Sequence, residues 1–248
     1  MLTALRVITA KDSLYWVGSL LSLSRINYSD EYGLTNMMYI NDDHKQYMRD
    51  GISRKDMDSD PFKQFETWYQ QAEQAEIRYP NAMSLATAGA DGMPSVRTVL
   101  LKAFDEQGFV FYTNYGSSKA KQLAQNAQAG ILFHWLELDR QVKISGHVER
   151  VSTAESVKYF MSRPRGSQLG AWCSSQSEPI SSRQMLETSW EQMKRRFKDK
   201  EVPLPDFWGG YRVKPVTIEF WQGRDSRLHD RLEYRRENDQ WVIERLAP

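Results

Sequence analysis

Hydrophobic residues recur at helical spacing after residue 60 and predict the first helix of the chain. Asp60 is a favoured N-cap residue, and Pro61 suits the first helical position. The apolar face of this helix consists of Phe62, Phe65, Trp68, Tyr69 and Ala72. Because proline disfavours helical geometry at the residue before it, we expect the helix to end near Tyr79 and Pro80.

Short apolar runs separated by turn residues follow, which is typical of antiparallel strands. They predict strands at 83–88, 95–102, 109–113, 131–136 and 141–151. Asp91-Gly92 favours a hairpin turn between the first two strands. Gly116-Ser117-Ser118 opens a short helix through Gln125, with serine as its cap.

The remaining pattern predicts further helices and strands. Ser152 and Glu155 have the spacing of a capping box before a helix. A longer helix spans about 181–198, with an apolar stripe of Leu186, Trp190, Met193 and Phe197. Strands are expected at 217–221, 227–234 and 241–246. Together these segments predict a mainly β (α+β) fold, in which helices cover the openings and edges of one antiparallel domain of six to eight strands.

Charge and composition exclude several classes of protein. The 248 residues contain 33 basic and 32 acidic side chains, so no global field attracts a nucleic acid or an anionic membrane. Cys173 is the one cysteine, which excludes an intrachain disulfide and favours a cytoplasmic location. None of the four histidines has the spacing of a helical metal pair, so we predict no metal site.

The first 27 residues differ in composition from the rest. Their apolar run at 14–21 is too short to span a bilayer, and Asp12 is their one acidic residue. Three interpretations stay open: a signal peptide, an organellar transit peptide, or an extension upstream of a true start at Met37 or Met38.

Cationic residues gather in places where anions could bind. Arg97 and Lys102 lie on one predicted strand, an odd number of residues apart, so they point to opposite faces unless a bulge or the strand end intervenes. The alternative is two solvated strand ends. The helix start at Ser117-Ser118-Lys119 suits a phosphate, although many helices begin with serine. A second phosphate could bind at Arg163 and Ser167.

A third group lies near the C-terminus. If residues 227–231 are extended, Arg227, His229 and Arg231 share one face, and a ligand on that face is favoured over solvent. The sequence shows no nucleophile–base triad, Rossmann fingerprint or P-loop. Several anion sites without acid–base machinery indicate that a cofactor carries the chemistry.

These clusters resemble the pyridoxine/pyridoxamine 5′-phosphate oxidases, flavin enzymes of the FMN-binding split-barrel class. The motifs that carry the resemblance include Arg97-Thr98-Val99-Leu100-Leu101-Lys102, Gln168-Leu169-Gly170-Ala171-Trp172, Trp208-Gly209-Gly210, Glu219-Phe220-Trp221-Gln222-Gly223 and Arg227-Leu228-His229-Asp230-Arg231. The similarity begins near Tyr47. It implies an oxidase domain at 47–248 and an N-terminal extension at 1–46 that is disordered, processed or the product of a misassigned start.

The resemblance implies a homodimer with FMN in two clefts, each built from both chains. The implied FMN contacts are Arg97, Thr98, Val99, Leu100, Leu101, Lys102, Tyr112, Thr113, Ser118, Lys119, Gln141, Gln176, Ser177, Trp221 and Arg231. The implied substrate contacts are Tyr47, Lys102, Tyr159, Arg163, Ser167, Arg227, Leu228 and His229, of which Arg227 and His229 are catalytic. The implied reaction oxidises pyridoxine or pyridoxamine 5′-phosphate to pyridoxal 5′-phosphate and reduces O₂ to hydrogen peroxide.

One position departs from the family pattern. Ser118 stands where the family usually has arginine, which removes a bidentate phosphate contact. Two alternative functions use the same resemblance: a non-catalytic module that carries FMN or pyridoxal phosphate, and a flavin reductase that uses NAD(P)H. Arg227 and His229 favour the oxidase over the carrier. The residues around Arg163 that are expected to bind the substrate phosphate disfavour the reductase.

Overall fold

The computed structural model describes residues 51–238 and 240–248. The expected N-terminal extension and the expected substrate contact at Tyr47 lie outside these residues. In chain order the elements are η1 (Arg54–Asp56), α1 (Pro61–Gln74), β1 (Ala82–Ala88), β2 (Pro94–Leu100), β3 (Ala103–Asp105), β4 (Gly108–Asn114), α2 (Ser118–Gln125), β5 (Gln128–Trp135), η2 (Leu136–Leu138), β6 (Arg140–Arg150), α3 (Thr153–Ser162), α4 (Arg165–Cys173), α5 (Arg183–Arg196), β7 (Trp208–Gln222), η3 (Asp225–Arg227), β8 (Asp230–Glu237) and β9 (Gln240–Leu246).

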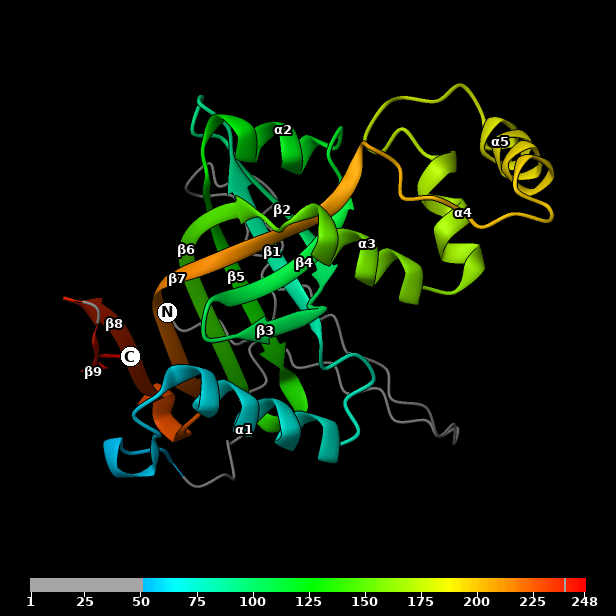
Figure 1. The fold of residues 1–248 in the computed structure, drawn as a ribbon. Coiled ribbons are helices and arrows are strands. Elements are labelled where there is room, and N and C mark those ends of the chain that lie inside the picture. The colour runs from blue at the N-terminus through cyan, green and yellow to red at the C-terminus, as the bar shows by residue number, and fades with distance from the viewer. Residues whose placement is uncertain (1–50, 239) are drawn as a thin grey trace, which may run out of the picture. The chain divides into compact units, whose positions relative to one another are not determined.

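The strands form one curled antiparallel sheet (Figure 1). Its order is β2-β1-β5-β6-β7-β4-β3, and β8 joins β7 and β9. The antiparallel mainly β fold is therefore confirmed. The expected count of six to eight strands is wrong, because the described residues form nine. The three-residue strand β3 is too short to give an apolar run of its own.

Strand β7 organises the sheet. It pairs with β6 along most of its length, with β4 through its first half and with β8 through its second half. The sequence predicts only its second half as a strand, and the structure extends it back to Trp208. The β6–β7 register shifts at Gly146, where a Cβ would lie 2.0 Å from the carbonyl oxygen of Lys214. Glycine is needed there because the two backbones approach so closely.

Helix α1 supplies aromatic residues to the core. Phe65 is fully buried and contacts the rings of Phe104, Phe109 and Phe133 at centroid distances of 4.9, 4.9 and 5.1 Å. The predicted cap is confirmed, because the Asp60 carboxylate accepts a hydrogen bond from the Phe62 N–H at 2.9 Å. The helix ends at Gln74, earlier than expected. Two residues later, Glu76 has a left-handed φ of 55°, which does not continue a helix.

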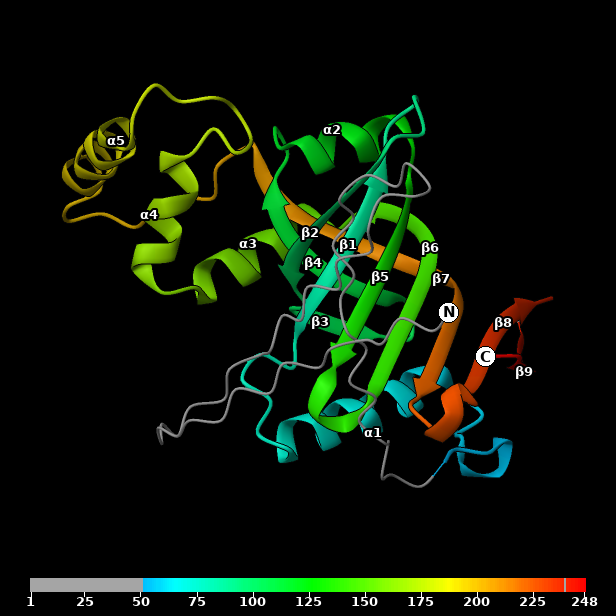
Figure 2. The same ribbon diagram turned by 180° about the vertical axis from the view of Figure 1, so that it is seen from behind.

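The other helices lie around the sheet (Figures 1 and 2). Helix α2 lies at the opposite end of the sheet from α1, and α3, α4 and α5 lie together on one side. The capping box before α3 is confirmed. No residue of α5 is fully buried, but three residues of its predicted stripe do pack: the half-buried Trp190 and Met193, and Phe197, which is buried directly after the helix ends. Within the described residues, no helix is long and apolar enough to cross a membrane.

Candidate active site

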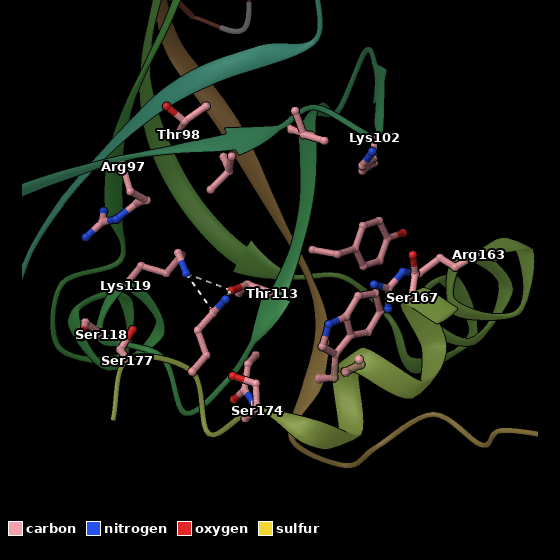
Figure 3. A pocket seen from close by; sticks show the side chains of 18 of the residues that line it. Arg97, Thr98, Lys102, Thr113, Ser118, Lys119, Arg163, Ser167, Ser174 and Ser177 are labelled. Carbon is pink, nitrogen blue, oxygen red and sulfur yellow. Dashed lines mark hydrogen bonds between the residues drawn. The ribbon is translucent and has the colours of Figure 1, made fainter. Parts of the chain in front are cut away.

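A pocket of about 790 Å³ opens between β2, β4, the start of α2 and the α3–α4 region (Figure 3). Its volume is in the usual range for small-molecule sites. It brings together most of the expected site residues. Those that line it are Arg97, Thr98, Val99, Leu100, Lys102, Tyr112, Thr113, Ser118, Lys119, Tyr159, Arg163, Ser167, Gln176 and Ser177. They come from distant parts of the sequence and include four cationic side chains, which lie in two groups (Figure 3).

Arg97 belongs to the first cationic group. Its guanidinium donates to neutral oxygens: the Leu85 carbonyl at 3.1 Å, the Thr87 hydroxyl at 2.6 Å and Ser95, whose hydroxyl lies at 2.7 Å. Burial lowers the pKa of Arg97. Among the described residues no carboxylate forms an ion pair with it, so its positive charge is held in place by dipoles alone.

Lys119 is the second member of this group. Its buried ammonium donates to the Thr113 hydroxyl and the Gln176 side-chain oxygen, both at 3.0 Å. Burial, together with the nearby Arg97, lowers the pKa of Lys119 to about 8. Ser117 occupies the expected N-cap of α2 but makes no side-chain cap hydrogen bond. The N-terminus of α2 and these two cations therefore favour an anion at this end of the pocket.

Lys102 and Arg163 form the second cationic group. Strand β2 ends at Leu100, so the alternation rule does not extend to Lys102, which lines the same pocket as Arg97. Burial and the nearby Arg163 lower the pKa of Lys102. The Nη1 atom of Arg163 is buried without a hydrogen-bond partner among the described residues. A buried donor of this kind calls for an anionic acceptor.

An aromatic stack lies beside this second group. The Tyr112 and Tyr159 rings stack with centroids 4.0 Å apart, and Trp208 stacks on Tyr112 at 5.4 Å. The guanidinium of Arg163 lies over the Trp208 ring at 4.6 Å. The sequence alone indicates no role for Trp208, although this residue belongs to the Trp208-Gly209-Gly210 motif. Gly210 permits the stack, since a Cβ there would lie 2.8 Å from Tyr112.

A second cluster lies in the β6–β8 part of the sheet, and its residues do not line this pocket. Gln141, Trp221 and Arg231 are directly opposite one another across β6, β7 and β8, so they share one face. The His229 ring lies against Trp221 with centroids 4.5 Å apart. The Arg224 backbone N–H donates to His229 Nδ1 at 3.1 Å. Burial, together with Arg227, lowers the pKa of His229.

The structure corrects the reason given for grouping Arg227, His229 and Arg231. Residues 225–227 form the short helix η3, and β8 begins only at Asp230, so the segment is not extended. Ser226 and Arg227 have left-handed φ values of 56° and 59°. Arg231 also has an acidic partner within the chain, because the buried Glu219 pairs with it at 2.7 Å. Glu219 comes from the adjacent strand β7, which inspection of one segment could not show.

Two other expected contacts lie away from the pocket. Leu101 is buried in the core, and its N–H donates to the Asn81 carbonyl at 2.8 Å. Leu228 is 70% exposed between Arg227 and His229. The pocket is also lined by Ser95, Val96, Asn114, Gly170, Ala171, Ser174 and Trp208, which the sequence did not single out as contacts.

The donor set fits a phosphorylated flavin and a phosphorylated substrate. Two cationic groups lie in one pocket without carboxylate ion pairs among the described residues, and Arg163 keeps an unused buried donor. Aromatic rings line the same space. The curled antiparallel sheet and this pocket define a flavoprotein of the FMN-binding split-barrel class.

Comparisons with known proteins identify the family. Residues 69–196 match the pyridoxamine 5′-phosphate oxidase family, and residues 208–248 match the pyridoxine 5′-phosphate oxidase C-terminal dimerisation region. A pyridoxine/pyridoxamine 5′-phosphate oxidase from Crocosphaera subtropica is 60% identical over 207 residues, covering 82% of this chain and 97% of that relative. One from Hahella chejuensis is 55% identical over 212 residues, covering 85% of this chain and all of the relative (100%).

Solved structures agree with this assignment. PhzG from Burkholderia lata, in complex with tetrahydrophenazine-1-carboxylic acid, has a TM-score of 0.75 and 30% identity over 78% of this chain and 95% of its own. A pyridoxamine 5′-phosphate oxidase-related, FMN-binding protein from Nostoc punctiforme has a TM-score of 0.63 at 18% identity, covering 76% of this chain and 97% of its own, and supports the fold. The chain belongs to the pyridoxine/pyridoxamine 5′-phosphate oxidase family. It is an FMN-dependent oxidoreductase and carries the dimerisation region of that family.

Proposed function

We propose that this chain oxidises pyridoxine or pyridoxamine 5′-phosphate to pyridoxal 5′-phosphate, with reduction of O₂ to hydrogen peroxide, at sites shared by two subunits. In this proposal the FMN phosphate binds at Arg97, Ser118, Lys119 and Ser177. The vitamer phosphate binds at Lys102, Tyr159, Arg163 and Ser167. Gln141, Trp221, Arg227, His229 and Arg231 of the partner subunit complete each site.

The separation of the two clusters is the observation that carries the proposal. One pocket holds both cationic groups, whereas Arg227 and His229 of the same chain lie outside its lining. A second subunit can supply them. Strand β2 favours this arrangement, because it is a sheet edge beside the pocket and exposes Val96 and Leu100.

The side chains of the protein bind and orient the reactants. FMN bound in this pocket would supply the two-electron chemistry that links the 4′ carbon of the vitamer to O₂. The two cationic groups fix the two phosphates and therefore the distance between the reacting rings. Because His229 Nδ1 accepts the Arg224 N–H, the neutral imidazole carries its proton on Nε2 and can donate it to the substrate.

Subunit complementation tests this division of the site. Arg163→Ala removes a vitamer-phosphate contact, and Arg227→Ala removes a group over the reacting ring, so each homodimer should bind FMN but turn over poorly. In a mixed dimer one site carries both changes and the other carries neither. Random reassociation of the two variants should therefore restore about a quarter of the native sites.

The measurement is the activity of the variants alone and after joint unfolding and refolding with FMN. A mixture that stays as inactive as its components would show that both residues act within one chain. Flavin absorbance of each variant provides the control for FMN loading. The carrier and reductase alternatives predict no oxidation of pyridoxine 5′-phosphate in any of these samples. The cytoplasmic location stays a prediction.

A further inference from the structure

The α4–α5 loop, defined as residues 174–182, forms one wall of the FMN-phosphate end of the pocket. It contributes Ser174, Gln176 and Ser177 to the pocket lining. Figure 3 shows Ser177 beside Ser118 at the start of α2. The placement of this loop therefore decides whether two of the expected FMN contacts are in position.

The loop has no buried residue to hold it. Every residue from 174 to 182 is exposed, and α5, which follows it, has no fully buried residue. Ser177 also has a left-handed φ of 72°, which is strained for a residue other than glycine. Polar contacts must therefore hold the loop in this conformation.

Three groups of contacts join the loop to β4 and α2. The Asn114 side chain donates to the Ser174 carbonyl at 3.1 Å, and Thr113 and Lys119 both donate to the Gln176 side chain. The third contact is an ion pair between Lys121 Nζ and Glu178 Oε1 at 2.6 Å. Lys119 and Thr113 are themselves expected FMN contacts, so a phosphate competes with the loop for their donors.

The ion pair differs from these contacts because neither of its residues lines the pocket. Lys121 lies on α2, three residues after Ser118, and Glu178 directly follows Ser177. It thus joins the element that begins the anion site to the loop that covers it. The ion pair is available for holding the loop whether or not a phosphate has engaged Lys119.

We propose that Lys121 and Glu178 form a latch that holds the α4–α5 loop closed over the FMN phosphate and slows the release of FMN. Both are positioning residues, which act through Gln176 and Ser177. The proposal rests on the FMN-phosphate site proposed above. It also explains how this chain can retain the cofactor with Ser118 at the helix start, since the latch stabilises the loop without contacting the phosphate.

The direction in which Glu178→Gln changes the Kd for FMN distinguishes a latch from a simple effect of charge. Removing a negative charge near a phosphate site should tighten FMN binding if charge alone matters. A broken latch should instead raise the Kd for FMN about three- to five-fold, mainly through faster release, which is the size of effect expected from an exposed ion pair. Fluorescence titration of the apoprotein gives the Kd, and stopped-flow dilution gives the release rate.

A matched control is available on α5. Arg183 and Glu187 form another exposed ion pair at 3.1 Å that does not touch the pocket. Glu187→Gln should leave both the Kd and the release rate unchanged. The charge swap Lys121→Glu with Glu178→Lys should recover most of the FMN affinity that Lys121→Glu loses alone.

Hydrogen exchange provides a measurement that does not depend on FMN. In the apoprotein, Glu178→Gln should speed amide exchange at residues 174–178, and Glu187→Gln should not. An unchanged or tighter Kd for Glu178→Gln overturns the latch. Lys119→Ala serves as the control for the site itself: if it leaves the Kd unchanged, the proposed phosphate site fails. If Lys119→Ala weakens binding while Glu178→Gln does not, only the latch fails.

Discussion

Burial lowers the pKa of the cationic side chains in the pocket. Lys119 is the clearest case, because its ammonium donates to three neutral oxygens while lying near Arg97. A cation in such surroundings gains more than a solvated one from a phosphate placed beside it. The cationic side chains of the pocket are therefore already in position to bind an anion.

FMN affinity should consequently depend on pH through Lys119. With a pKa of about 8, this side chain is a cation below that pH and a neutral amine above it. Phosphate prefers the cation, so affinity is fully present below about pH 8 and is lost as the pH rises through that value, approaching tenfold per pH unit. FMN titrations across this range measure the effect. Lys119→Arg should flatten the profile, and an identical slope in both proteins would contradict the assignment.

Ser118 is the second residue whose effect can be measured. It is exposed at the first position of α2, so a longer side chain can be accommodated. Ser118→Arg adds a bidentate cation at the phosphate end and should lower the Kd for FMN about tenfold. Ser118→Gln, similar in length but neutral, should change it little. An unchanged or weaker affinity in the arginine variant would refute the role of Ser118.

At the scale of elements, the start of β7 contributes to the shape of the pocket as much as the loops do. Trp208 is its first residue, supports the Tyr112–Tyr159 stack and lies under Arg163. The element therefore positions the side chains that we propose to bind the vitamer, Tyr159 and Arg163.

Trp208→Leu should raise the KM for pyridoxine 5′-phosphate about five- to tenfold, because Arg163 loses a cation–π partner. The kcat and the Kd for FMN should change much less. Steady-state kinetics together with FMN titration check this, and Trp208→Phe should recover part of the KM. An FMN affinity that falls as far as the KM rises would point to general loosening of the pocket.

The sequence predicts elements well where a local signal exists. The α1 cap at Asp60, the capping box at Ser152 and the bounds of α2 are all confirmed. Local signals fail where partners are distant. The ion pair of Arg231 depends on Glu219 of the neighbouring strand β7, and the role of Trp208 depends on Tyr159 of α3. No spacing within one segment contains that information.

At the scale of the whole molecule, the proposed site couples cofactor and subunits. If FMN contacts two chains, its binding and dimerisation must strengthen each other to the same degree. Sedimentation at low protein concentration should show tighter dimers with FMN than without it. The same dimer dissociation constant in both samples would place FMN within a single subunit.

The resemblance to the family anticipated more at this scale than the residues alone did. Motif order predicted the fold and most of the residues that line the pocket, Lys102 and Arg163 among them. It could not show that Leu101 belongs to the core or that Leu228 is exposed. Both residues lie within matched motifs. Only the packing of the folded sheet shows that their surroundings differ from those of the neighbouring motif residues.

The continuity of β7 has a consequence for how this sequence can evolve. Trp208, at its start, belongs to the pocket, and Trp221, near its end, belongs to the second cluster. Inserting or deleting one residue between them would turn every following side chain to the opposite face. It would also break the registers with β6 and β8 together. A change in the length of this segment should therefore disturb the structure more than a substitution at most of its positions.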